Sequence, residues 1–264
     1  MKIKNIIAGA FILTFLYALF VPVELIRYTL TDGEHTIVFQ TMVHIAKPSF
    51  YNTVEADAKS YTENGYTFLF EGVLPSKAEL SDTIKTGNAK KSKYYMYDVS
   101  SYMLGLTNQG RSGYYNAIAN LRNTFDADVD FDWINEQFKK ANIISNNPLK
   151  SESDADLDKE ISEIDAHRSL YAAISLPLFR VGYRVGLLHD CFNELNQSYS
   201  PFMKIIVVKR NEVLYDNIVY VYSHLDSDKI YINYGAGHFT NFYALLKSHN
   251  SKWHIIEEKS YEAF

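Results

Sequence analysis

The sequence predicts an α/β fold with a largely parallel central sheet that is flanked by helices. Short runs rich in β-branched and aromatic residues alternate with segments of helical periodicity. A helical segment joins the first two runs, and a crossover of this kind makes its two strands parallel. The chain has 264 residues, is 47% hydrophobic and contains only 12 Gly and 6 Pro, a composition that excludes disordered and collagen-like proteins.

The chain divides into an apolar N-terminal segment, residues 1–28, and a single domain, residues 29–264. Residues 6–23 carry no charge and follow Lys2 and Lys4. At about 1.5 Å per residue this run approaches the roughly 30 Å of a hydrocarbon core. No small-residue cleavage site follows it, so we expect an N-terminal transmembrane helix with the C-terminal domain outside the cytoplasm. The alternatives are a cleaved signal, which would leave a secreted or periplasmic protein, and a buried helix.

The first two strands are predicted from the apolar runs at 36–43 and 66–70. Residues 52–64 between them contain few helix breakers and end at Gly65, and glycine is the residue expected just past a helix C-terminus. This part of the chain therefore forms a strand, helix and strand unit.

The C-terminal part repeats this alternation of strand and helix. We expect strands at 203–208, 229–234 and 253–256, and helices at 214–225 and 242–248. The last of these strands is short.

Between the two halves of the sheet, residues 75–200 are polar and mainly helical, so we expect a helical insertion that covers one end of the sheet. Its candidate helices are residues 80–84, 114–121, 133–140, 157–164 and 170–188. The last is nearly as apolar as a membrane span but contains Arg180 and Arg184, each of which costs about 2.5–3.5 kcal/mol at the centre of a membrane. We therefore expect a helix of the domain core and not a second span.

Polar residues follow every strand predicted to precede a helix. They are His44 after the first strand, Glu71 after the second, Arg210 and Asn211 after the third, and His238 just after the fourth. The carboxyl ends of parallel strands share one edge of the sheet, and open α/β folds bind ligands at that edge. Two imidazoles, a carboxylate and a guanidinium are therefore expected to converge.

Imidazole and carboxylate groups suit a divalent metal such as Mn, Co or Zn, with one coordination position left for water or substrate. The single cysteine, Cys191, cannot build a thiolate site or an intrachain disulfide alone. The expected ligands are His44, Glu71 and His238, with Glu71 either a ligand or the general base.

The remaining candidates would support the reaction and the ligand. Arg210 would stabilise a developing oxyanion or bind a substrate carboxylate. Gly235 and Gly237, in Tyr-Gly-Ala-Gly-His, allow a tight turn from strand to helix and a close approach of the backbone to a cofactor.

These residues occur in segments that resemble the TraB/PrgY/GumN and Tiki group. The segments read Thr-Met-Val-His-Ile-Ala-Lys-Pro-Ser-Phe-Tyr, Phe-Leu-Phe-Glu-Gly, Lys-Arg-Asn-Glu-Val-Leu and Asn-Tyr-Gly-Ala-Gly-His-Phe-Thr-Asn-Phe. The group is marked by two Gly-x-x-His motifs, a Glu that closes the second strand and an Arg-Asn pair that opens a helix. The second motif is intact from Gly235 to His238, whereas Thr41 stands at the glycine of the first. The resemblance covers about residues 36–75 and 203–258.

The resemblance implies an α/β domain related to the Tiki metalloproteases, which cleave peptides with a divalent metal of the Mn or Co kind. Carried over position by position, it makes His44, Glu71 and His238 the metal or catalytic centre, with Arg210 and Asn211 in support. Other members are similar to peptide-pheromone shutdown proteins, and a more distant relative binds haem. A non-catalytic module that binds a peptide or haem is therefore the alternative to an enzyme.

Other functions lack their markers. A formal net charge of −5 offers no footprint for a phosphate backbone, so we expect no nucleic-acid partner. An alternating series mimics the start of a calcium-binding loop, but Phe131 and Gln137 occupy its required Gly and Glu positions. The series comprises Asp126, Asp128, Asp130 and Asp132.

We therefore expect a membrane-tethered, metal-dependent hydrolase of peptide or protein substrates. A structural membrane protein, in which the same residues form only ion pairs and caps, is the third possibility.

Overall fold

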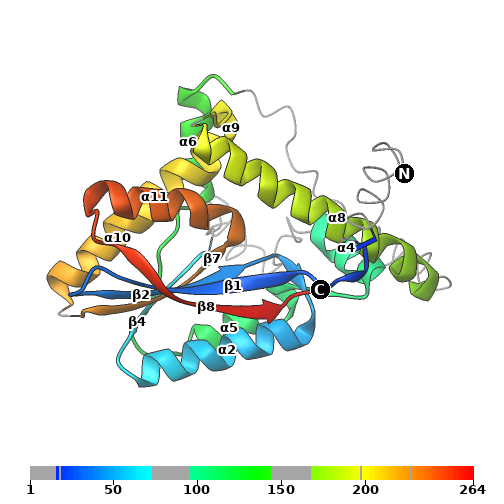
Figure 1. Cartoon of the computed structure of the whole chain (residues 1–264), viewed down its shortest axis with the longest axis horizontal. Coiled ribbons are helices and arrows are strands. Elements are labelled where there is room, and N and C mark those ends of the chain that lie inside the picture. The colour runs from blue at the N-terminus through cyan, green and yellow to red at the C-terminus, as the bar shows by residue number, and fades with distance from the viewer. Residues whose placement is uncertain (1–15, 18, 73–94, 144–167, 197, 226) are drawn as a thin grey trace, which may run out of the picture.

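The computed structural model describes residues 16–17, 19–72, 95–143, 168–196, 198–225 and 227–264. Within these residues, six strands form one sheet in the order β6-β4-β7-β2-β1-β8 (Figure 1). The strands are β1 (Glu24–Thr31), β2 (Thr36–Met42), β4 (Thr67–Phe70), β6 (Thr124–Asp126), β7 (Lys229–Gly235) and β8 (His254–Glu262). A second, two-stranded sheet pairs β3 (Ile45–Ala46) with β5 (Thr107–Asn108).

The four strands from β6 to β2 are mutually parallel, and β1 and β8 extend the sheet in antiparallel pairing. The fold is therefore α/β with a mostly parallel central sheet, as the sequence predicts. Strand β7 lies between β2 and β4 and pairs with both, so the predicted crossover unit is parallel but its two strands are not neighbours.

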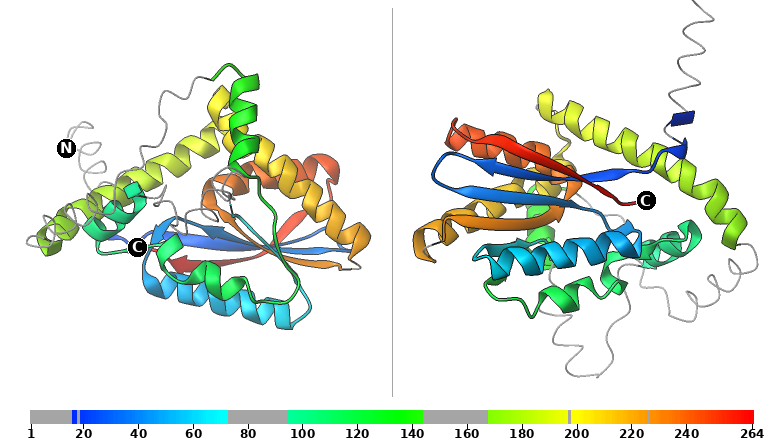
Figure 2. Two further views of the ribbon diagram at one scale, coloured as in Figure 1. Left: turned by 180° about the vertical axis from the view of Figure 1, so that it is seen from behind. Right: turned by 60° about the horizontal axis from the view of Figure 1, so that its bottom comes forward.

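Helices cover both faces of the sheet, as Figure 2 shows. Helices α2 (Pro48–Glu63) and α5 (Tyr114–Ile118) lie on one face, and α10 (Arg210–His224) and α11 (Phe239–His249) lie on the other (Figure 1). The other described helices are α4 (Tyr95–Leu104), η1 (Gln109–Arg111), α6 (Phe131–Lys140), α8 (Arg168–Leu195), α9 (Pro201–Met203), η2 (Lys204–Lys209) and η3 (Ala236–His238). Because both faces are covered, the parallel strands read as continuous apolar runs.

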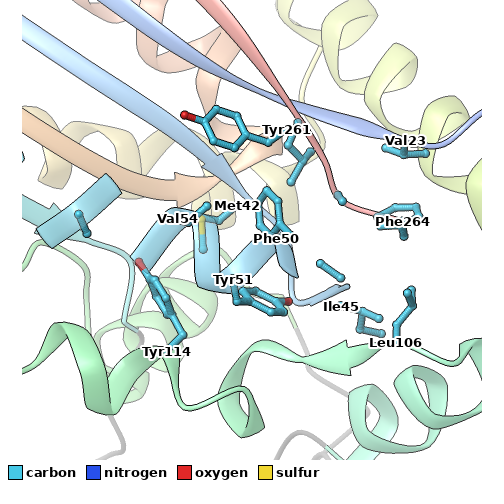
Figure 3. Packing of buried hydrophobic residues seen from close by; sticks show 14 of the residues in the cluster. Val23, Met42, Ile45, Phe50, Tyr51, Val54, Leu106, Tyr114, Tyr261 and Phe264 are labelled. Atoms are coloured by element: carbon cyan, nitrogen blue, oxygen red, sulfur yellow. The ribbon is translucent and has the colours of Figure 1, made fainter. Parts of the chain in front are cut away.

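Each face of the sheet has its own core. On the α2 side, Phe50, Tyr51 and Val54 pack against Met42 of β2 and Tyr114 of α5 (Figure 3). Burial of a large apolar side chain contributes roughly 1.5–3 kcal/mol. The second core joins α10 and α11 to the opposite face and centres on Leu214, Ile218, Phe242 and the sheet residues Phe39 and Ile232.

The strand predicted at 203–208 is wrong. These residues form the end of α9 and the π-helical segment η2, which runs directly into α10. Ser200 caps this helical stretch, because its hydroxyl accepts a hydrogen bond from the amide of Met203 at 3.2 Å, and Pro201 occupies the first helical turn. The N-terminal signals outweigh the β-branched composition of the run, so Arg210 and Asn211 reach the sheet edge from a helix.

The segment 75–200 is not purely helical, because it contributes the edge strand β6. The predicted helices at 114–121 and 133–140 appear as α5 and α6, whereas those at 80–84 and 157–164 lie outside the described residues. The last strand, predicted at 253–256, is the longer β8, and it pairs antiparallel with β1.

The prediction for 170–188 is correct for the helix and only half correct for its burial. Helix α8 packs Phe179 and Tyr183 against Phe264, with ring centroids 5.0 and 5.2 Å apart. Its opposite side is open, and Leu178 is 57% exposed. Among the described residues no helix is both long enough and apolar enough to cross a membrane. The span predicted within residues 1–28 lies mostly outside the described residues, and β1 begins at Glu24.

Candidate functional site

The candidate site lies at the carboxyl edge of the parallel strands. Strands β2, β4, β6 and β7 run in the same direction, so the residues that follow them leave the sheet at one edge. Glu71 directly follows β4, and its backbone amide donates a hydrogen bond to the carbonyl of Asn233 in β7 at 2.9 Å. The edge therefore positions Glu71 beside the end of β7, from which Gly235 and His238 follow.

The carboxylate of Glu71 is held at both oxygens. Its Oε1 accepts a hydrogen bond from Nη2 of Arg210 at 2.5 Å, and its Oε2 accepts one from the backbone amide of Gly235 at 2.5 Å. A Cβ at position 235 would lie 3.0 Å from this Oε2 and 3.4 Å from Cδ2 of His238. Gly235 is needed for space and not for an unusual backbone angle, since its φ is −52°. Gly237 lies in η3, which joins β7 to α11.

Arg210 bridges two carboxylates, the fully buried one of Asp128 and the partly buried one of Glu71. Besides Glu71, it binds Asp128 in a bidentate manner, with Nε 2.8 Å from Oδ1 and Nη2 2.5 Å from Oδ2. The hydroxyl of Tyr234 donates to the same Asp128 at 3.0 Å. Sequence reasoning did not assign Asp128 to the site. It lies two residues beyond β6, so the strand-end rule would have found it if that three-residue strand had been recognised.

The charges in this cluster are set by burial and by Arg210. Burial alone raises the pKa of Glu71, but the neighbouring charge of Arg210, helped by His238 and His44, lowers it to about 2. Burial raises the pKa of Asp128 against the pull of Arg210. The pKa of Arg210 is itself raised by the charge of Glu71 and the hydrogen bonds of Asp128, which outweigh its own burial. Glu71 is therefore ionised at every physiological pH.

The ring of His238 is buried and fixed by Asn211. The amide Nδ2 of Asn211 donates to the carbonyl of His238 at 3.0 Å and to Oδ1 of Asn241 at 2.9 Å. Its Oδ1 therefore faces Nδ1 of His238, 2.9 Å away, and this ring nitrogen carries the proton. The other ring nitrogen, Nε2, keeps its lone pair. Burial lowers the pKa of His238 to about 4 despite the charge of Glu71, so the imidazole is neutral at pH 7.

His44 interacts electrostatically with Glu71 and His238 but, unlike His238, is exposed to solvent. Its side chain is exposed and lies against the ring of Tyr97, with centroids 4.8 Å apart. Its charge acts on the pKa values of both Glu71 and His238.

Within the described part of the chain, no three His, Cys, Asp or Glu side chains are arranged so that they could hold a metal ion. The donor types suit a divalent metal, and His238 Nε2 carries the lone pair that a metal needs, whereas both oxygens of Glu71 already accept hydrogen bonds.

Asp126, at the end of β6, adds a group that titrates near neutrality. Burial and the charges of Asp128 and Glu71 raise its pKa to about 7, against hydrogen bonds from the backbone. Its Oδ2 packs against Gly72, where a Cβ would lie 2.9 Å away. Asp126 and Glu71 are thus two carboxyl groups at one edge whose pKa values are pushed far apart, an arrangement typical of acid and base pairs in active sites.

Tyrosine rings surround the polar cluster. The ring of Tyr234 meets His238 edge-on at 4.8 Å, and the hydroxyl of Tyr115 donates to the backbone carbonyl of Glu71 at 3.3 Å. Tyr234 is completely buried, whereas Tyr97 and Tyr115 are partly exposed, so these two rings give the cluster aromatic surface that an apolar or planar ligand would contact.

No protein-family model, curated protein sequence or solved structure matches this chain. The resemblance to the TraB/PrgY/GumN and Tiki group therefore stays a prediction.

Proposed function

We propose that this edge is the catalytic centre of a membrane-tethered, metal-dependent hydrolase that cleaves peptide bonds. The observation that carries the proposal is the state of His238. It is a buried imidazole, neutral at pH 7, whose Nδ1 is tied to Asn211, so that the lone pair lies on Nε2, and whose ring interacts electrostatically with the ionised Glu71. Metal-binding histidines are commonly oriented in this way by a partner on the second nitrogen.

The side chains of this chain divide the work between them. His238 and His44 would hold a divalent ion such as Mn, Co or Zn, which lowers the pKa of a bound water and polarises the scissile carbonyl. Glu71 is a poor base, because a group with a pKa of about 2 has little affinity for a proton at pH 7. We assign it the role of balancing positive charge at the site. Asp126, with a pKa of about 7, is suited to accept the proton of the attacking water and return it to the leaving amine.

Arg210 is a positioning residue in this scheme. Its Nε and Nη2 are committed to Asp128 and Glu71, and its Nη1 donates to the carbonyl of Ile206 at 3.3 Å. This differs from the sequence-based expectation that Arg210 binds the oxyanion, because the guanidinium is already engaged by protein groups. Its effect on the reaction would come through the place and charge of Glu71.

The rival proposal is a module that binds a peptide or haem without catalysis. The specific observation in its favour is the pair of partly exposed tyrosine rings, Tyr97 and Tyr115, beside the polar cluster. Such rings pack well against a planar ligand or against apolar side chains of a peptide.

The test uses the full chain in detergent micelles with a defined mixture of peptides. Mass spectrometry would follow cleavage with and without chelator, and elemental analysis would measure bound Mn, Co and Zn. We expect cleavage that is lost on chelation and in H238A, and that persists in H254A, because His254 is an exposed imidazole away from the site. Stoichiometric metal without any cleavage, or a Soret band in the purified protein, would favour the binding module. Cleavage that survives both chelation and H238A would exclude this centre.

A further inference from the structure

Helix α8 exposes a row of large apolar side chains on one side. Six of them are more than a third exposed: Leu170 (58%), Tyr171 (39%), Ile174 (56%), Leu178 (57%), Val185 (59%) and Leu188 (70%). At 3.6 residues per turn these six positions fall within a sector of about 100° around the helix axis. They therefore form one continuous outward face, which we call the α8 apolar face.

The opposite side of α8 is also apolar and is already used by the fold. Leu176, Phe179 and Tyr183 pack against the core on the α2 side of the sheet. A helix that covers a soluble domain normally turns polar residues outward, so an outward apolar face needs a separate explanation.

The two charges of this region do not reach the α8 apolar face. Between residues 170 and 188 the only charged residues are Arg180 and Arg184. Arg184 Nη2 donates to the carbonyls of Val21 and Pro22, each at 2.9 Å. Arg180 Nη1 donates to the carbonyls of Leu19 and Phe20 at 3.4 Å. Both guanidinium groups are thus turned toward the N-terminal segment.

These hydrogen bonds attach the end of the apolar N-terminal run to α8, and Figure 2 shows the start of the described chain beside this helix. Leu16, Tyr17 and Phe20 are exposed there by 42, 62 and 67%. They belong to the uncharged run at residues 6–23. A second exposed apolar surface, in the longest uncharged stretch of the chain, therefore lies beside α8.

We propose that the α8 apolar face rests in the interfacial layer of a lipid bilayer, beside residues 16–20. Helices that lie in this layer bury their apolar side about 5–10 Å below the headgroups. The face is built mainly from Leu, Ile and Val, whereas protein interfaces are enriched in aromatic residues and Arg and are bordered by a polar rim. Arg180 and Arg184 reach polar carbonyls from apolar stems, as arginines do at a membrane boundary. The inference does not depend on catalysis.

The test measures the surroundings of α8 directly, since the N-terminal run alone could bring the protein to vesicles. In full-length C191S protein, a nitroxide would be attached at L178C or V185C and the protein reconstituted in phosphatidylcholine and phosphatidylglycerol vesicles. The matched control is V219C on α10, because Val219 is an exposed apolar residue, 46% accessible, on another helix. Collision rates with oxygen, which partitions into lipid, and with a nickel chelate, which stays in water, would be compared by electron paramagnetic resonance. Circular dichroism would establish that each labelled protein is folded.

We expect positions 178 and 185 to collide often with oxygen and rarely with the nickel chelate, and position 219 to collide often with the nickel chelate. Frequent collision with both reagents at 178 and 185 would place the face in water and overturn the proposal. Rare collision with both would show that protein covers the face, either a second copy or another segment of this chain, and would overturn it as well.

Discussion

Asn211 holds His238 at two points, since its Oδ1 accepts from the ring Nδ1 at 2.9 Å and its Nδ2 donates to the backbone carbonyl at 3.0 Å. The side-chain amide of Asn211, at the start of α10, therefore fixes both the ring and the backbone of His238. This pairing determines which tautomer His238 adopts and leaves the lone pair of the ring on Nε2.

Replacing this amide by a carboxylate should change the proton affinity of the ring. In N211D, a negative charge next to Nδ1 stabilises the imidazolium, so the pKa of His238 should rise from about 4 toward its ordinary range. Histidine resonances in an NMR titration would measure it, and His254 in the same spectra serves as the internal control. A folded N211D protein in which His238 titrates as before would contradict the assigned contact.

Adding a methyl group at Gly235 should displace the Glu71 carboxylate. The new Cβ would meet Oε2 at 3.0 Å, so G235A should lower the free energy of unfolding by about 1–3 kcal/mol, as overpacking does. G182A is the matched control, because a Cβ at this α8 glycine meets nothing within 4 Å. That change should leave stability unchanged or raise it by up to about 1 kcal/mol. Urea denaturation would compare the two, and equal effects would refute the close contact.

Removing the charge of Arg210 should leave the buried carboxylate of Asp128 and the partly buried one of Glu71 without their partner. R210M is expected to lower the free energy of unfolding by about 3–5 kcal/mol, the usual result of breaking a buried ion pair on one side. K140M breaks an exposed pair with Glu136 and should lower the free energy of unfolding far less, because water screens the two charges. If chemical denaturation gave similar losses for both variants, the Arg210 network would not be the buried structure described above.

Asp126 should make stability depend on pH in a defined direction. Its pKa is about 7 in the folded chain and 3.8 as an ordinary value, so between these two values the unfolded chain has released this proton while the folded chain retains it. The contribution of Asp126 to stability therefore falls as the pH rises from about 4 to 7. D126N removes this dependence, and its stability relative to the parent should improve over that interval. Thermal melts at a series of pH values would measure the difference, and a constant difference would exclude the raised pKa.

The opposite dependence is expected from His238. Its pKa is 6.5 as an ordinary value and about 4 in the folded chain, so the unfolded chain takes up a proton first as the pH falls. Stability from the neutral ring is present above pH 6.5 and is lost as the pH falls toward 4. H238Q should remove this loss, whereas H254A should retain it. A parent and H238Q whose stabilities change in parallel from pH 7 to 4 would contradict the burial effect.

The parts of the fold that the sequence predicts are those with a local signal. Strands β2, β4 and β7 are buried on both faces and therefore read as apolar runs, and Gly65 marks the end of α2. Strand β1 escapes this reasoning, and only the start of β8 is predicted, because the two pair at an antiparallel edge, where β8 is mostly exposed. The helical form of 203–208 depends on the cap at Ser200, which competes with β-branched composition in a way that composition alone does not reveal.

The sequence predicts where the candidate site lies but not which of its side chains contact one another. The strand-end rule locates the backbone of His44, Glu71 and His238 at one edge, yet it is silent on where each side chain points. His44 turns to the surface and lies on Tyr97, while the bidentate partner of Arg210 is Asp128, beyond a strand of three residues. Such pairings arise from tertiary packing and have no signature at fixed sequence spacing.

The place of β7 in the sheet has a consequence for the order in which the protein is made. Strands β2 and β4 are synthesised more than 150 residues before β7, yet both pair with β7 in parallel. Contacts this distant in sequence form slowly, since a long loop must close before they are gained. A ribosome that has not yet released residue 235 therefore carries a chain in which Glu71 has neither the Gly235 amide nor a neighbouring His238. The edge would therefore have no chemistry until residues 235–238 have left the ribosome and β7 has paired with β2 and β4.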